Sequence, residues 1–129
     1  MRFRRLSLSR DGRRIFVVED ETLVLINLED MLDELGWTVL AQAMWLPEAE
    51  RLAASVEAPD AAILDVNIGG VTVFPAARIL AERGVPILFA TGYGREGLPP
   101  EWQDRPVIMK PYTQRDVAQA LADLMDTAA

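Results

Sequence analysis

The chain has 129 residues, close to the commonest size for one compact domain, and its formal net charge is −7. It has no cysteine, which excludes disulfides and zinc–thiolate sites, and no histidine, which excludes Ser-His-Asp hydrolysis and imidazole metal sites. Chemistry is therefore left to carboxylates, hydroxyls, arginines and the only lysine, Lys110.

The first 14 residues differ in charge from the rest of the chain. They carry six arginines and one aspartate, whereas the remaining 115 residues carry seven cations and 19 acids. Residues 1–13 show no persistent hydrophobic period, so we predict a flexible basic arm there, with contact to nucleic acid or an anionic surface as the alternative. The acidic body argues against nucleic-acid binding by the folded domain. With no secretory signal and no apolar run of the roughly 20 residues that a membrane span needs, we expect a cytoplasmic protein.

Apolar runs and helical spacings alternate along residues 14–129, which we predict to form a single domain. In chain order they predict a strand over 15–18, a helix over 23–35, a strand over 38–43, a helix over 47–56 and a strand over 61–64. There follow a helix over 74–83, a strand over 85–90, at most a short helix within the glycine- and proline-rich stretch 91–103, a strand over 106–109 and a helix over 113–126, capped by Thr113. This alternation implies a parallel sheet with helices on both faces.

Polar residues follow four of the five predicted strands directly. The first strand leads into Glu19 and Asp20, the third into Asp65, the fourth into Thr91 and the fifth into Lys110. In a parallel sheet these carboxyl ends lie at one edge, where open α/β sheets place their ligand chemistry. A single aspartate there can simply end a strand, and the alternative for the whole set is a group of salt-bridged strand ends.

Three carboxylates at one edge raise one another's pKa, so such clusters usually hold a cation. Oxygen ligands without histidine or cysteine favour a hard ion, and a site this small suits Mg²⁺. A magnesium ion beside a free carboxylate and a lysine is suited to phosphoryl transfer, because metal and ammonium neutralise the phosphoryl oxygens while the carboxylate attacks in line. The Thr91 hydroxyl can hydrogen-bond a phosphoryl oxygen.

From about Arg14 to the C-terminus, the sequence resembles the receiver domain of bacterial two-component response regulators. Four motifs carry the resemblance, in order and at suitable intervals: VVEDE at 17–21, ILDVN at 63–67, FATGYG at 89–94 and MKPY at 109–112. The resemblance implies an α/β, flavodoxin-like (βα)5 receiver fold, with a five-stranded parallel sheet of order 2-1-3-4-5 and helices on both faces. It also implies that the Lys110-Pro111 bond is cis, which few X–Pro bonds are.

By this resemblance the domain takes a phosphoryl group from the phosphohistidine of a histidine kinase or phosphotransfer protein. The residues so implied are the phosphoacceptor Asp65, the Mg²⁺ ligands Glu19, Asp20, Asp65 and Asn67 (through its backbone carbonyl), the switch hydroxyl Thr91 and the phosphoryl-contacting Lys110. The domain would catalyse its own aspartyl phosphorylation and dephosphorylation and turn over no separate substrate. We expect a monomer or weak dimer that signals through protein contacts on the fourth helix, fifth strand and fifth helix, with no nucleic acid and no membrane as partners.

The FATGYG motif also resembles the FAT GUY subgroup of receivers, which are often single-domain proteins that work with HWE or HisKA2 histidine kinases. One position departs from the wider family. Most receivers carry Tyr or Phe three residues before the lysine, and this side chain rotates inward on activation, whereas the present chain has Val107. Either Tyr93 or Tyr112 takes over that role, or activation orders the segment 92–102 instead.

Three other interpretations compete with a phosphorylated receiver. The stretch 92–97 matches G-x-G-x-x-G, but Leu98-Pro99-Pro100 follows where a dinucleotide site needs a helix. An EF-hand loop beginning at Asp65 fails because its twelfth position is Ala76. The last alternative is a pseudo-receiver, a constitutive binding scaffold with the same fold, and the retention of all the site residues disfavours it.

Overall fold

The computed structural model describes residues 13–128, so the predicted basic arm lies outside the described residues except for Arg13. A five-stranded parallel sheet of order β2-β1-β3-β6-β7 forms its centre, and this confirms the predicted order of 2-1-3-4-5 over the five main strands. These strands are β1 (Arg14–Val18), β2 (Thr38–Ala43), β3 (Ala61–Asp65), β6 (Ile87–Thr91) and β7 (Val107–Met109). Over residues 13–128, no helix combines the length and apolar character needed to cross a bilayer.

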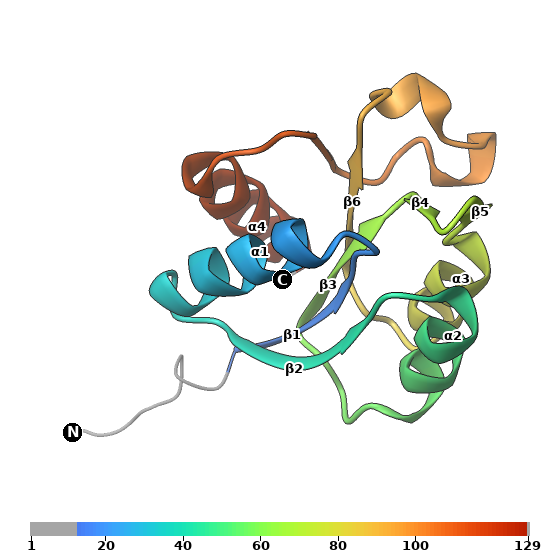
Figure 1. The fold of residues 1–129 in the computed structure, drawn as a ribbon, viewed down its shortest axis with the longest axis horizontal. Helices are drawn as coiled ribbons and strands as arrows, with labels where there is room; N and C mark the ends of the chain where they lie inside the picture. Colours follow the sequence, from blue (N-terminus) through green and yellow to red (C-terminus); the bar gives the residue numbers. More distant parts are fainter. Residues whose placement is uncertain (1–12, 129) are drawn as a thin grey trace.

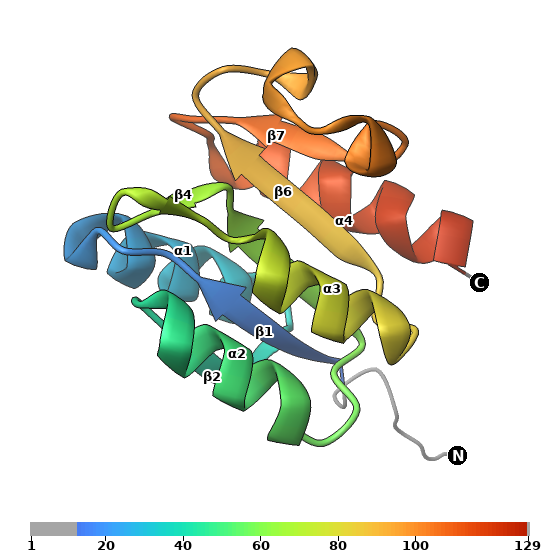
Figure 2. The same cartoon turned by 90° about the vertical axis from the view of Figure 1, so that its right-hand side faces the viewer.

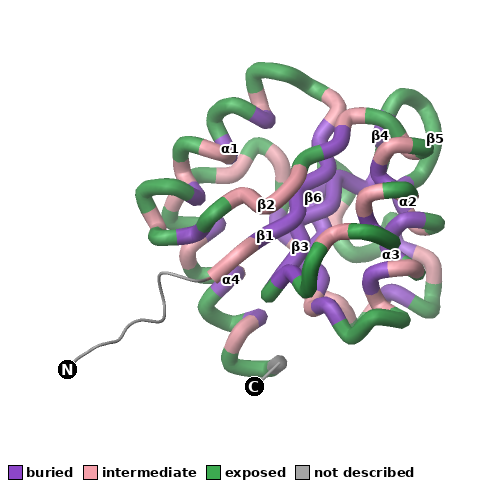
Figure 3. Tube along the Cα trace, turned by 90° about the horizontal axis from the view of Figure 1, so that it is seen from below, coloured by how far each residue is buried: buried purple, intermediate pink, exposed green. Residues whose placement is uncertain are grey.

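Two helices cover each face of the sheet (Figure 1, Figure 2). One face carries α1 (Thr22–Glu34) and α4 (Gln114–Ala128), and the other carries α2 (Leu46–Ser55) and α3 (Phe74–Glu82). Phe16 and Leu64 pack toward α2 and α3, whereas Val17 and Ile63 pack toward α1 and α4, because successive strand residues point to opposite faces. Every residue of β3 and β6 is consequently buried, as the colouring of the central strands in Figure 3 shows.

The connection between β6 and β7 contains no α-helix. It forms two single turns of 3-10 helix, η2 (Arg95–Gly97) and η3 (Pro100–Trp102). The prediction of at most a short helix here is therefore confirmed. The fourth helix that we expected as a contact surface consists only of these two turns. Its prolines lack a backbone N–H and its glycines disfavour helix, which explains the absence of a longer one. The Arg95 guanidinium donates to the carbonyls of Gln103 and Arg105 at 2.7 and 2.6 Å, and these bonds hold the segment together.

A short β-hairpin follows β3 directly, and the sequence patterns did not predict it. Its strands are β4 (Asn67–Ile68) and β5 (Val71–Thr72), which pair antiparallel. The two residues between them, Gly69 and Gly70, have φ of +59° and +86°. Positive φ at both positions is what a type I′ turn requires and what glycine adopts without a steric penalty. The hairpin therefore folds back over the carboxyl edge of the sheet immediately after Asp65.

The turn from β7 into α4 contains the cis Lys110-Pro111 bond that the family resemblance implied. Thr113 caps α4 as predicted: its Oγ1 accepts the Asp116 N–H at 3.1 Å, and its own N–H donates to Asp116 Oδ2 at 2.9 Å. This reciprocal pair satisfies two N–H groups at the start of the helix. It fixes the capping residue of α4 three residues after Lys110.

Candidate functional site

The predicted site residues meet at the carboxyl edge of the sheet. Glu19 and Asp20 follow β1, Asp65 is the last residue of β3, Thr91 is the last residue of β6, and Lys110 follows β7. Because β3 lies between β1 and β6, Asp65 is at the centre of this edge. The Lys110 N–H donates to the Thr91 carbonyl at 2.9 Å and so continues the pairing of β7 with β6 beyond the end of the strand.

Lys110 joins the carboxylates that arrive from the other strands. Its Nζ lies 3.1 Å from Oδ2 of Asp65 and 3.1 Å from Oε1 of Glu19. Both carboxylate side chains are almost fully buried, whereas Glu21, whose Oε1 is 3.9 Å from the same Nζ, is exposed. The single ammonium therefore connects the ends of β1 and β3 to the turn after β7.

Glu19, Asp20 and Asp65 form a compact set of oxygen donors. Each offers a carboxylate oxygen, and the three oxygens lie within 4.8 Å of one another. A group of carboxylates without nitrogen or sulfur donors suits a small hard cation such as Mg²⁺, which retains several waters. The donor chemistry and spacing of these residues therefore fit the predicted metal. Asn67, the first residue of β4, lies beside them and is exposed.

Burial dominates the titration of this cluster. It raises the pKa of Glu19 to about 7, with the nearby charge of Asp65 acting in the same direction, and it also raises the pKa of Asp65. Burial alone would lower the pKa of Lys110, but its hydrogen bonds and charge interactions with Asp65 and Glu19 outweigh this and raise that pKa above its ordinary value. The one ammonium of Lys110 is thus outnumbered by the three acids Glu19, Asp20 and Asp65. This excess of acidic groups favours the binding of a further cation.

An open cleft of about 670 Å³ gives access to the cluster, and it is lined by Asp20, Glu21, Asp65, Asn67, Gly70, Gly92, Tyr93 and Lys110. Thr91 is not among the lining residues, because its side chain is buried with 3% of the residue exposed. Its Oγ1 accepts the Tyr93 N–H at 3.0 Å. The predicted switch hydroxyl is thus beside the cleft and engaged by the start of the β6–β7 segment.

Two site contacts were missed by the sequence analysis. The Gly69 N–H, at the tip of the unpredicted hairpin, donates to Asp20 Oδ2 at 2.8 Å and positions this carboxylate. Glu21, which was not predicted as a site residue, is the third acid near Lys110, after Glu19 and Asp65. The Gly-Gly pair that follows Asn67-Ile68 is the signal that could have indicated the hairpin.

The three positions considered for an aromatic switch differ in their surroundings. Val107 packs against the core beneath α2 and α3. Tyr93 is 76% exposed. Tyr112 packs against the other core, and its hydroxyl is buried. Of the two tyrosines, only Tyr112 is placed inside the fold.

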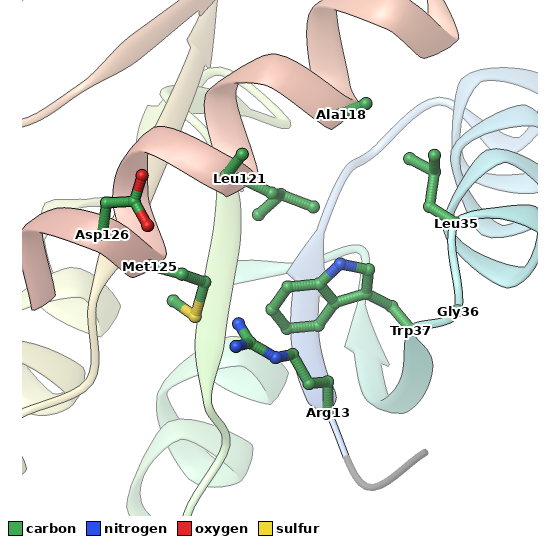
Figure 4. A pocket seen from close by; sticks show the side chains of 9 residues that line it. Arg13, Leu35, Gly36, Trp37, Ala118, Leu121, Met125 and Asp126 are labelled. Atoms are coloured by element: carbon green, nitrogen blue, oxygen red, sulfur yellow. The ribbon is translucent and has the colours of Figure 1, made fainter. Parts of the chain in front are cut away.

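A second hollow lies at the opposite end of the sheet, between the ends of α1 and α4 (Figure 4). There the Arg13 guanidinium carbon is 5.6 Å from the centre of the Trp37 ring, and Leu121 and Met125 add apolar surface. Across residues 13–128, the one set of three acids close enough to share a metal is at the carboxyl edge. The candidate site is therefore the cleft around Asp65.

Comparison with known proteins places this geometry beside bacterial signalling proteins. No protein-family model matches the chain. The transcriptional regulatory protein PdtaR of Mycobacterium tuberculosis is 30% identical in an alignment 115 residues long, which covers 84% of this chain and 55% of PdtaR, so the chain spans about half the length of that relative. SdrG from Sphingomonas melonis is 40% identical, with a TM-score of 0.75 and coverage of 89% of this chain and 98% of SdrG.

Two further structures describe ligands in similar folds. The BeF₃-activated conformation of SdrG is 39% identical with a TM-score of 0.72, covering 88% of this chain and 96% of that structure. The receiver domain of the sensor histidine kinase PA1611 from Pseudomonas aeruginosa, with a magnesium ion coordinated in its active-site cleft, is 23% identical with a TM-score of 0.76 and covers 89% of this chain and 98% of that domain.

The raised pKa of Glu19 predicts how the stability of the metal-free protein changes with pH. Between the ordinary value of 4.5 and about 7, the folded state holds a proton that the unfolded chain has released, so the free energy of unfolding falls as pH rises through this range. The expected fall is on the order of 2–3 kcal/mol. Chemical denaturation with a chelator present, at several pH values, measures it.

Glu19→Gln removes this titration and is expected to reduce the fall, whereas Glu57→Gln, an exposed change beyond α2, is expected to leave it as in the wild type. Two results would contradict a raised pKa of Glu19 in the folded state. One is a wild type whose free energy of unfolding rises across this pH range, and the other is a fall in Glu19→Gln as large as that in the wild type.

Proposed function

Because the chain belongs to the receiver-domain family of response regulators, we propose that it is a signalling module switched by phosphorylation of Asp65. The observation that carries this proposal is the Lys110 ammonium, which lies 3.1 Å from the Asp65 carboxylate within an acidic cluster. A phosphoryl group on Asp65 would bring new negative charge to this ammonium. Placing a fixed cation where charge develops is the main way in which proteins accelerate phosphoryl transfer.

The reaction forms one bond and breaks one. A carboxylate oxygen of Asp65 attacks the phosphorus of a phosphohistidine, the O–P bond forms, and the P–N bond breaks with its electron pair leaving on the imidazole nitrogen. Lys110 orients the carboxylate beforehand and neutralises a phosphoryl oxygen during transfer. The domain thereby catalyses its own phosphorylation, and attack of water on the aspartyl phosphate breaks the O–P bond, releases inorganic phosphate and restores the Asp65 carboxylate.

Glu19, Asp20 and Asp65, with the carbonyl of Asn67, would hold Mg²⁺ in this site. A bound Mg²⁺ supplies further neutralisation of the phosphoryl oxygens. The all-oxygen donor set supports this choice of metal. So does the magnesium ion in the cleft of the PA1611 receiver domain, which shares the fold.

We propose a histidine kinase, of the HWE or HisKA2 type that the FATGYG motif implies, or a phosphotransfer protein as the phosphoryl donor. Large exposed apolar side chains on the segments around this edge support a protein partner there, since apolar surface is favourably buried against another protein. The large exposed apolar residues of the described chain lie on segments that begin or end at the carboxyl edge: Leu23, Ile26, Trp45, Val71, Tyr93 and Met109.

The segment 92–106 is proposed to transmit the change, together with the surfaces of β7 and α4. The Thr91 hydroxyl contacts the N–H of Tyr93, the second residue of this segment. Rotation of the Thr91 side chain toward a phosphoryl oxygen would carry Oγ1 away from the Tyr93 N–H, so the beginning of the segment is expected to rearrange. The existence of a BeF₃-activated conformation of SdrG supports a change of structure in this group of proteins.

Incubation with a small phosphodonor and Mg²⁺ is expected to add one phosphoryl group to the protein, as measured by intact mass. Asp65→Asn should abolish the addition, a chelator should suppress it at least about tenfold because the metal neutralises charge in the transition state, and Asp33→Asn on the exposed face of α1 should leave it unchanged. Labelling that persists in Asp65→Asn would contradict the site. A wild type that several donors fail to label would favour the constitutive scaffold.

Phosphorylation is also expected to slow amide hydrogen exchange across residues 92–102, because the Thr91 switch would order the segment that follows it. Exchange of the wild type with and without BeF₃⁻ and Mg²⁺ measures this, and Thr91→Ala should lose most of the protection. Equal exchange in the two states would reject the ordering of this segment as the response.

A further inference from the structure

The turn of the β4–β5 hairpin makes a contact that the proposed reaction does not use. The Gly69 N–H of this turn donates to Oδ2 of Asp20 at 2.8 Å. Asp20 is one of the three carboxylates that would hold Mg²⁺. A hydrogen bond to an ionised carboxylate is shorter and stronger than one between neutral groups, so this bond can fix the orientation of the Asp20 side chain.

The hairpin is anchored in the core, so its turn has a fixed position relative to the sheet. At its base, the Val73 N–H donates to the Val66 carbonyl at 2.9 Å, and the Val66 N–H donates to the Ala90 carbonyl of β6 at 3.0 Å. The Ile68 side chain is buried in the core beneath α2 and α3. The hairpin therefore presents its amide to the carboxyl edge from a rigid support.

The side chain of Trp45, between β2 and α2, lies over the tip of the hairpin. Two carbons of its indole would be 3.6 and 3.7 Å from a Cβ placed on Gly69, which is ordinary van der Waals contact. Trp45 is nevertheless 59% exposed, so burial in the core does not account for the position of its ring. The ring supports the turn from the side that faces α2.

The backbone of the turn depends on its second glycine more than on its first. Gly69 has φ of +59° and Gly70 has φ of +86°. Asparagine is also common at the first of these positions in a type I′ turn, whereas the second strongly favours glycine. A β-branched residue at positive φ is strained, so valine at Gly70 would distort the turn. A Cβ there meets nothing within 4 Å, so the distortion would come from the backbone and not from a clash.

We propose that the β4–β5 turn is a positioning element for the metal: its Gly69 N–H holds Oδ2 of Asp20 and leaves Oδ1 to the Mg²⁺. Because the carboxylate is already oriented in the metal-free protein, binding does not have to immobilise it, and such preorganisation raises affinity. Groups that orient metal ligands typically change metal affinity by about 10- to 100-fold. This inference deepens the proposed Mg²⁺ site and rests on it.

Titration with Mg²⁺ alone, followed by tryptophan fluorescence or calorimetry, tests the proposal. Gly70→Val is expected to weaken Mg²⁺ affinity about tenfold, because the strained turn moves the Gly69 N–H away from Asp20. Gly69→Asn is expected to bind Mg²⁺ within about twofold of the wild type, since Asn-Gly suits the same type I′ turn and retains the N–H.

Gly36→Val is the matched control for strain. Gly36 has φ of +88° with nothing within 4 Å of an added Cβ, but it follows α1 at the opposite edge of the sheet. This variant should lose stability as Gly70→Val does, measured by chemical denaturation with a chelator present, and should keep the Mg²⁺ affinity of the wild type. If a valine variant does not fold, alanine at the same two glycines gives the comparison with a smaller expected loss of affinity.

Wild-type Mg²⁺ affinity in Gly70→Val would overturn the positioning role while leaving the metal site in place. So would an equal loss of affinity in Gly36→Val, because strain anywhere in the fold would then explain the effect, or a tenfold loss in Gly69→Asn. Asp20→Ala separates the two levels of the proposal. If Asp20→Ala binds Mg²⁺ as well as the wild type does, the proposed metal site itself fails and the role of the turn fails with it.

Discussion

The ammonium of Lys110, held between two nearly buried carboxylates, is the interaction on which the site depends. Glu19 and Asp65 come from neighbouring strands, and their charges would repel each other in a place where water screens them little. A lysine at 3.1 Å from both offsets part of this repulsion but leaves an excess of negative charge. The excess negative charge that destabilises the metal-free cluster favours the binding of a divalent cation, and the Lys110 ammonium favours a phosphoryl group on Asp65.

The sheet provides this arrangement by geometry alone. Parallel strands end at one edge, and strands with helices on both faces are buried to their last residue, so an acid placed there is buried as well. Asp65 sits at the centre of the edge because β3 is the middle strand of the five. The opposite edge shows the contrast: the hollow beside Trp37 is lined mainly by apolar side chains, with Arg13 and the single acid Asp126, and among residues 13–128 the only set of three acids close enough to share a metal is the one at the carboxyl edge.

The five main strands and most of the site residues could be predicted from the sequence, because each prediction depends only on a short stretch of neighbouring residues. The apolar runs at 15–18 and 61–64 identify buried strands, and the residue after each run must lie at the carboxyl edge, so Glu19 and Asp65 could be placed together without coordinates. The β4–β5 hairpin escaped prediction because strands of two residues are too short for a periodic pattern. The buried hydroxyl of Tyr112 and the engaged hydroxyl of Thr91 could not be foreseen, since both depend on how side chains from distant segments pack.

A crystal structure of the protein grown with Mg²⁺ and BeF₃⁻ tests the central claim most directly. We expect BeF₃⁻ bound to a carboxylate oxygen of Asp65 and contacted by Lys110, with the metal held by the Glu19, Asp20 and Asp65 cluster. BeF₃⁻ or the metal bound elsewhere, with Lys110 still between Glu19 and an unmodified Asp65, would contradict it.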